Sequence, residues 1–362
     1  MKLYDYSGII HFHSEYSFDG RASIPEIIGA ARESGIDFLI LTDHDNLEAR
    51  EKGEEGWHGN VLLLSGEEVC LGQFNHYLVF GHDRPLGPAF AGGSSPQALI
   101  DKVREQGGIG FIAHPDHEGT EMFHVKQYAW TEWGVGGYTG MSIWDFMTDW
   151  QSSLKGYASG FFGYFFPAYA LRGPRQVTLK RWDELAKTRK IAGIGECDNH
   201  DTPKKLFGVT LRVFPFRRAF RFVVRTHVLL AEELTPGNKT GISNILDALR
   251  RGAGYVAMEY FASARGFSFT ISSGPREATM GEDFLLDGPA DLRVTTPAEG
   301  MIRIIKDGMV FLQKKGAELE HRVVEKGVYR VEVSLKRSGR NRPWIYSNPI
   351  YVKEGERLKT KC

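Results

Sequence analysis

The sequence is poor in cysteine and has no long apolar run. Its three cysteines, Cys70, Cys197 and Cys362, include no Cys-x-x-Cys pair, which excludes a disulfide framework and favours a reducing compartment. The first ten residues, MKLYDYSGII, lack the apolar segment of a signal peptide. The most apolar stretch, residues 160–171, is too short to span a bilayer and contains a proline. We therefore expect a cytoplasmic protein without a membrane partner.

An excess of charge of either sign is also absent. Lys and Arg total 45, Asp and Glu total 45, and the formal net charge is zero. No long basic run is present, so we do not expect a nucleic-acid partner and expect a small-molecule substrate instead. A chain of 362 residues, 42% hydrophobic and 25% charged, suits a soluble protein with one large domain and a smaller one. The sequence leaves the oligomeric state open.

The first two-thirds of the chain alternates short apolar runs with helical patterns. Strands are expected at 7–13, 36–45, 60–69, 76–81, 109–116 and 191–198, and helices at 23–35, 95–108, 179–190 and 242–254. Alternation of this kind predicts a parallel α/β domain, and a barrel suits its length.

The pattern changes near residue 266 to a period of two. Asp307-Gly308 between apolar runs predicts a hairpin. In the run from 328 to 335, Tyr329 and Val331 fall on one face while Arg330 and Glu332 fall on the other. We expect residues 266–362 to form a small antiparallel β domain, similar to a sandwich.

An aromatic- and glycine-rich stretch at 116–190 interrupts the alternation. Its large side chains include Trp130, Trp133, Tyr138, Trp144 and Trp150. The favoured interpretation is a subdomain with its own small core, and the alternative is a lid or pocket wall over a site.

Residues that bind metals stand at nearly every expected strand end. They are His11, His13, the triplet 43–45, Glu67, Glu68, His76, His114, Asp198 and His200. In a parallel α/β domain these ends lie on one face, where active sites are built. So many ionisable groups would repel one another and lose hydration there, and bound divalent cations would resolve both problems. The sequence therefore predicts a metal site.

The segments HFHSEYSFDG, TDHD, SGEEV, NHYLVFG, AHP and CDNH, in this order, resemble the PHP (polymerase and histidinol phosphatase) family of metal-dependent hydrolases. The resemblance implies a distorted (β/α)7 PHP barrel over residues 1–265, followed by the β domain. It also implies that two or three Zn, Mn or Fe ions are bound, and three ions would form a trinuclear centre. The resemblance places His11, His13, Glu68 and Asp198 around the first ion. Glu68 would bridge to a second ion, bound by His76 and His114. The third ion would be bound by Asp19, His44 and His200.

Two features of the resemblance leave alternatives open. The family pattern Gly-x-Glu selects Glu68, with Glu67 as the alternative. The residue before the last ligand is Cys197, which we interpret as a packed small hydrophobe, with an extra ligand or an oxidation-sensitive thiol as alternatives.

The function that the resemblance implies is phosphoester hydrolysis by a hydroxide that bridges two metals. Asp45 or His117 would aid proton transfer or, equally, orient the ligands. Candidates for binding substrate phosphate are Arg21, Arg172, Arg175, Lys204 and Arg265, although each suits an ordinary surface position. The alternatives are a carboxylic ester or carbamate hydrolase, which the aromatic stretch would suit, a nuclease, which the neutral charge disfavours, and a non-catalytic binding module stabilised by metal.

Overall fold

The computed structural model describes residues 2–90, 94–121, 124–206 and 208–355. The division into residues 1–265 and 266–362 stays a prediction, and Cys362 lies outside the described residues. Up to residue 152 the elements are β1 (Tyr4–Ile10), α1 (Ile24–Glu33), β2 (Phe38–His44), α2 (Glu48–Glu51), β3 (Gly56–His58), β4 (Val61–Cys70), β5 (His76–Phe80), α3 (Gly87–Phe90), α4 (Pro96–Glu105), β6 (Ile109–Ile112), β7 (Gly140–Asp145) and α5 (Phe146–Ser152).

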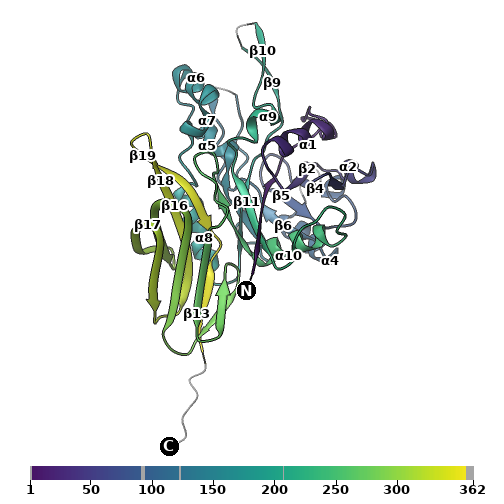
Figure 1. The fold of residues 1–362 in the computed structure, drawn as a ribbon. Helices are drawn as coiled ribbons and strands as arrows, with labels where there is room; N and C mark the ends of the chain where they lie inside the picture. The colour runs from purple at the N-terminus through teal and green to yellow at the C-terminus, as the bar shows by residue number, and fades with distance from the viewer. Residues whose placement is uncertain (1, 91–93, 122–123, 207, 356–362) are drawn as a thin grey trace, which may run out of the picture.

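The described residues from 157 to 257 form five helices, three strands and a projecting hairpin. These elements are α6 (Tyr157–Phe165), α7 (Pro167–Ala170), α8 (Gln176–Ala186), β8 (Ala192–Glu196), β9 (Pro203–Leu206), β10 (Val209–Arg212), α9 (Phe216–Ala219), β11 (Arg225–Leu230), α10 (Gly241–Arg251) and β12 (Gly254–Ala257). Strands β9 and β10 form the hairpin that extends at the top of Figure 1, near α6.

The N-terminal strands form a curled sheet. Strands β1, β2 and β4 are parallel neighbours, and so are β6, β7 and β8. Strand β5 runs antiparallel to both β4 and β6, which corrects the expectation of a fully parallel sheet. Beyond β8, the amide of Cys197 donates to the carbonyl of Ile10 at 3.0 Å, so the sheet curls back on β1. The expected α/β fold is confirmed, with the sheet distorted at β5.

Both faces of these strands are buried, as their continuous apolar runs predict. On β4, Leu63 joins the apolar cluster that includes residues of α1, α4 and α8. Its neighbours Leu62 and Leu64 join a second cluster with α10. Because side chains alternate along a strand, Glu68 continues the face of Leu62 and Leu64, whereas Glu67 continues that of Leu63. This register decides which carboxylate faces the site.

The C-terminal region consists of strands around its own apolar core. They are β13 (Ser268–Ser273), β14 (Arg276–Thr279), β15 (Asp283–Leu286), β16 (Ala290–Lys306), β17 (Met309–Val323), β18 (Gly327–Arg337), β19 (Arg340–Ser347) and β20 (Ile350–Glu354). The Asp307-Gly308 hairpin is confirmed between β16 and β17. Most pairs are antiparallel, but β15 and β20 are parallel, contrary to the expectation of a purely antiparallel domain.

The C-terminal strands, green to yellow in Figure 1, pack closely on the N-terminal part. Strand β12 pairs with β19, which joins the two parts in one sheet. Arg330 was expected on the face opposite to Tyr329 and Val331. It is buried there and binds Asp183 of α8 through two contacts of 2.6 and 2.9 Å. The second face of β18 therefore packs against α8 at this residue.

Candidate metal centre

Chain segments from six parts of the sequence meet at one end of the curled sheet. The pairing of β2 with β4 sets His44 beside Glu68, and the pairing of β4 with β5 sets Cys70 beside His76. Because β5 is antiparallel, its first residue lies at the same edge as the last residues of β2 and β4. The nine predicted ligands all come together there, in four overlapping groups whose ligand atoms lie within 4.8 Å of one another.

The first group contains His11, His13, Glu68 and Asp198. Nε2 of His11 lies 3.1 Å from Oε2 of Glu68 and 3.3 Å from Oδ1 of Asp198. Nε2 of His13 lies 3.4 and 3.5 Å from the same two oxygens. Two imidazole nitrogens and two carboxylate oxygens thus converge on one point, as around a Zn, Mn or Fe(II) ion.

The second group uses the other oxygen of Glu68. Oε1 lies 2.7 Å from Nδ1 of His76 and 3.1 Å from Nε2 of His114. Glu68 belongs to three of the four groups, so its carboxylate stands between the first group and the second. This geometry suits a carboxylate that bridges two ions.

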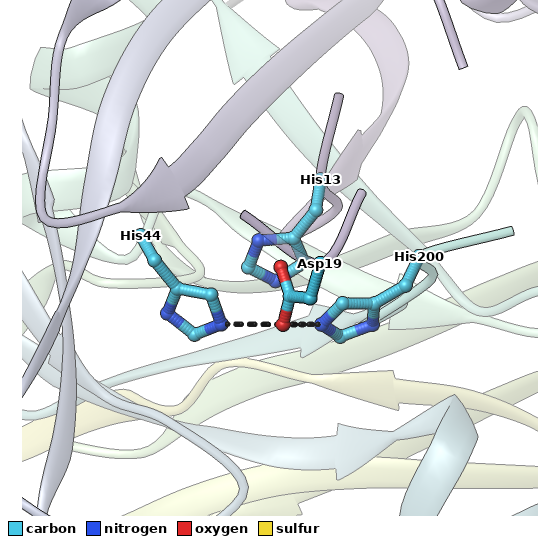
Figure 2. Close-up of side chains that lie close together, drawn as sticks. All are labelled: His13, Asp19, His44 and His200. Atoms are coloured by element: carbon cyan, nitrogen blue, oxygen red, sulfur yellow. Dashed lines mark ion pairs between the residues drawn. The ribbon is translucent and has the colours of Figure 1, made fainter. Parts of the chain in front are cut away.

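The third group lies beside the first and is formed by His13, Asp19, His44 and His200. Figure 2 shows the Asp19 carboxylate between the rings of His44 and His200, with Oδ2 at 3.2 Å from Nε2 of each. The loop after β1 returns Asp19 to the cluster, and Ser17 holds it there by donating to Oδ1 at 2.8 Å.

Two observations indicate that these residues suit divalent metal ions. The buried Nε2 of His13 has no hydrogen-bond partner although it faces the cluster, and a buried polar atom in that state costs free energy unless something binds it. Three other histidines use their second ring nitrogen to donate outwards: His11 to Glu196 at 2.9 Å, His114 to the Tyr128 carbonyl at 3.2 Å and His200 to the Asp198 carbonyl at 3.2 Å. Such bonds fix the tautomer that presents a lone pair to a metal.

Strong electrostatic coupling characterises the cluster. Burial raises the pKa of Glu68, but the charges of His11, His44 and His76 outweigh burial and hold that pKa well below its usual range. In turn, Glu68 overcomes the effect of burial on His44 and His114 and raises the pKa of each to about 9. Burial and the neighbouring His200 and His44 lower the pKa of His13 instead. The cluster thus holds mutually compensating charges.

Strained backbone accompanies the site. Three of the predicted ligands have positive φ angles: 65° at His11, 25° at His114 and 51° at Asp198. Each such residue costs on the order of 1–3 kcal/mol and persists where its surroundings impose it, most often at functional sites. Strand β1 ends at Ile10, and not at residue 13 as expected from the sequence, so His11 and His13 converge through this turn.

Two site residues were missed from the sequence. Glu196 accepts a hydrogen bond from His11 and another, 2.5 Å long, from the amide of His114. Cys70 places its sulfur 3.2 Å from Nδ1 of His44, in the fourth group with Glu68. Each lies two residues from a predicted ligand on or next to a strand, and that spacing was the available signal.

The side chains of Cys197 and Glu67, which the sequence left as alternative ligands, point away from the site. Cys197 is fully buried in the apolar core, in agreement with its interpretation as a packed small hydrophobe. Glu67 accepts hydrogen bonds from His82 at 2.8 Å and from the amides of Leu86 and Gly87. Its role is to anchor the chain after β5.

Asp45 and His117 flank the cluster and belong to none of the four groups. Asp45 accepts from the amide of Cys70 at 3.2 Å. His117 accepts from the amide of Tyr128 through Nδ1 and donates from Nε2 to Gln151 at 2.8 Å. Burial, and then the charge of His114, lower the pKa of His117 to about 4, so its ring is neutral near pH 7. Their part in proton transfer stays a prediction.

Most tryptophans of the aromatic stretch contribute to the core, whereas Tyr157, Phe161 and Phe165 of α6 are exposed. Trp130, Tyr138 and Trp144 are buried in the apolar cluster, and Trp133 packs partly buried against it. The large aromatic side chain exposed beside the centre comes instead from the loop after β1: Phe18 is 77% exposed and stacks on His44 with 4.9 Å between ring centroids.

Comparisons with known proteins give a family match and several similar chains. The sequence model of the PHP domain matches residues 10–83. An uncharacterised protein of Methanocaldococcus jannaschii is 27% identical over 124 residues, a match that covers 29% of this chain and only 66% of that relative's length.

Two solved structures are also similar. A two-domain protein from Bacteroides vulgatus, which contains a predicted PHP-like metal-dependent phosphoesterase, has a TM-score of 0.44 and 15% identity, with 96% of this chain and 95% of that one covered. Endonuclease Q in complex with a 27-mer duplex has a TM-score of 0.38 and 13% identity over 68% of this chain and 57% of that one. The comparisons give no support to the expectation that nucleic acid is not a partner.

The part of the chain that the structure describes contains no helix long and apolar enough to cross a membrane. The family match begins at Ile10, the last residue of β1, and ends just beyond β5. It therefore includes six of the nine predicted ligands, namely His11, His13, Asp19, His44, Glu68 and His76. The resemblance seen in the sequence is confirmed over residues 10–83, where the PHP domain model matches.

Proposed function

We propose that this protein is a metal-dependent phosphoesterase that hydrolyses a small-molecule phosphoester. The observation that carries the proposal is the position of Glu68, whose two carboxylate oxygens face separate histidine sets. Two or three Zn, Mn or Fe ions would be bound. When bound, adjacent divalent ions lower the pKa of water and stabilise charge on the attacking and leaving oxygens of a phosphoester.

The protein would hold the ions as the resemblance implies. His11, His13, Glu68 and Asp198 would bind the first, Glu68, His76 and His114 the second, and Asp19, His44 and His200 the third. Glu196 would orient two ligands at once, because it bonds to the ring of His11 and to the backbone of His114. Loss of such an orienting contact commonly weakens metal binding by about 10–100-fold.

Arg21 is the basic residue best placed for substrate phosphate. It lies on the loop that carries Phe18 and Asp19, and its guanidinium donates to the carbonyls of Phe18 and Gly20. Among the described residues it forms no ion pair, whereas Arg175 pairs with Glu118 and Arg265 with Asp37. An exposed, unpaired guanidinium beside the cluster suits a phosphate oxygen.

His117 and Asp45 would have different tasks. The neutral His117 ring holds the amide of Tyr128, whose carbonyl in turn accepts from His114, so His117 suits the positioning of a ligand better than proton donation. Asp45 is half-buried and accepts one hydrogen bond, from the amide of Cys70. It is the better candidate for proton transfer to the leaving group.

The alternatives have less support. Hydrolysis of an ester or carbamate was considered because the aromatic stretch could form an apolar wall that binds such a substrate. Trp130 and Trp144 of that stretch are buried in the core. A non-catalytic binding module would not need nine converging ligand residues with strained backbone at three of them.

The test is an assay of metal-loaded protein against phosphomonoesters, phosphodiesters, nucleotides, oligonucleotides and aryl esters, with Arg21→Met as a variant. We expect a phosphoester to be the best substrate, inorganic phosphate to inhibit competitively, and Arg21→Met to raise KM more than it lowers kcat. Faster hydrolysis of aryl esters, without inhibition by millimolar phosphate, would contradict the proposal.

A further inference from the structure

Cys70 occupies a position in the metal centre that the ligand set implied by the family resemblance does not use. It is the last residue of β4 and lies two residues after Glu68, so both side chains project from the same face of the strand. Across the antiparallel pair its register partner is His76, another predicted ligand. The sulfur is therefore held by a regular strand among established members of the cluster.

Three different donor atoms meet at this point. Sγ of Cys70 lies 3.2 Å from Nδ1 of His44, and the same nitrogen lies 3.4 Å from Oε2 of Glu68. The three ligand atoms all lie within 4.8 Å of one another, as in the other groups of the cluster. His44 faces this group with Nδ1 while its Nε2 faces Asp19, so the ring stands between two ligand groups.

We propose that Cys70 is a thiolate ligand of the metal centre, on an ion that Glu68 also binds. Nδ1 of His44 keeps its proton and donates to the sulfur, so that its Nε2 stays available for the third ion. As the sulfur–metal bond forms, the thiol loses its proton to solvent, and no oxidant or reductant is involved. A soft thiolate favours zinc or cobalt over manganese, since hard ions prefer an all-oxygen and imidazole set. Cys70 would thus bias which ion this chain retains.

A second observation points to a bound ion in the adjoining group, which shares Glu68 with the Cys70 group. The buried Nε2 of His13 has no hydrogen-bond partner, and the His13 ring stacks on that of His44 with 4.5 Å between centroids. An unpartnered nitrogen next to the Cys70 group is an atom that a bound ion would satisfy. By contrast, Cys197 lies in the apolar core and in none of the four groups, which makes it a matched control.

The proposal rests on the metal centre of the proposed function, but its test does not depend on catalysis. Full-length protein is stripped of metal and loaded with cobalt(II), as wild type, Cys70→Ser and Cys197→Ser. We expect a near-ultraviolet thiolate-to-cobalt charge-transfer band in the wild type and in Cys197→Ser, and its loss in Cys70→Ser. The visible ligand-field bands should persist in all three, and zinc affinity should fall by about tenfold or more in Cys70→Ser alone.

The outcomes separate the two proposals. Cobalt binding without the charge-transfer band in the wild type, or a band unchanged in Cys70→Ser, would overturn the role of Cys70 and leave the metal centre intact. Absence of any cobalt binding would overturn the metal centre itself and the Cys70 proposal with it.

Discussion

Glu67 and Glu68 are consecutive in the sequence, and their side chains point to opposite faces of strand β4. Glu68 contacts His76 and His114 in the cluster, whereas Glu67 accepts from His82 and from two backbone amides behind the strand. The family match includes both residues, so the register of the strand decides between them.

Amide substitutions at these two positions should have separable effects. Glu68→Gln should lose most of the bound metal and the hydrolytic activity, because an amide is a poor bridging ligand. Glu67→Gln should keep the metal and the activity but lower the free energy of unfolding by about 1–3 kcal/mol, since it weakens three buried hydrogen bonds. Elemental analysis and thermal unfolding check both variants. Metal loss in Glu67→Gln alone would mean that the register is shifted by one residue.

Phe18 should determine substrate preference in place of the tryptophans of the central stretch. Its exposed ring stacks on His44, so Phe18→Ala should change the KM for the preferred phosphoester several-fold and leave the metal content unchanged. Trp133 stacks on Arg181 at 3.8 Å and packs on the core, so Trp133→Ala should cost about 1–3 kcal/mol of stability with little change in KM. Steady-state kinetics measure the KM of both variants, and chemical denaturation measures their stability. A large change of KM in Trp133→Ala, with none in Phe18→Ala, would contradict the prediction and place Trp133 at the site.

The buried ion pair between Arg330 and Asp183 should hold the C-terminal strands on α8. Arg330→Met leaves Asp183 buried without its partner, which should cost about 3–5 kcal/mol. The exposed pair of Arg293 and Glu320 is the control, and Arg293→Met should cost less than about 1 kcal/mol. The kcat of folded Arg330→Met should stay within about twofold of wild type. A loss of stability no larger than that of the control would contradict this role.

Asp149 should make stability depend on pH. Burial raises its pKa to about 6, although the amides of Arg172 and Gly173 and the indole of Trp144 donate to it. A raised pKa means that the folded state binds the proton more tightly. The resulting stability is fully present below about pH 4, the unfolded pKa, and is lost as the pH rises through 6.

Asp149→Asn cannot titrate, so its free energy of unfolding relative to wild type should rise between pH 4 and 7, by at most about 3 kcal/mol. Denaturant titrations of both proteins at four pH values measure this difference. A difference that does not vary with pH would show that Asp149 stays ionised throughout.

Local patterns in the sequence were enough to predict much of the site. The family pattern Gly-x-Glu selected Glu68, and the positions of His44, His76 and His114 near strand ends placed them on one face. That prediction survives the antiparallel direction of β5, because His76 begins its strand while Glu68 lies near the end of its own. Strand direction itself depends on which neighbours a strand finds, and this is not encoded in its own residues.

Contacts between distant segments account for what the sequence could not predict. Arg330 is buried only because α8, 147 residues earlier, supplies Asp183. The left-handed backbone at His11 is set by hydrogen bonds to residues near 198, and no propensity of histidine indicates it. Of the two cysteines near predicted ligands, Cys197 directly precedes Asp198 in the sequence, yet its side chain faces the core, whereas Cys70, two residues after Glu68, faces the cluster.

The most direct test of the account is the metal content of the full-length protein purified without chelator, measured by elemental analysis beside hydrolysis of the preferred phosphoester. The account predicts two or three equivalents of zinc, manganese or iron per chain, with activity lost on chelation and restored when metal is returned. A folded, active protein that holds one equivalent or none would contradict it.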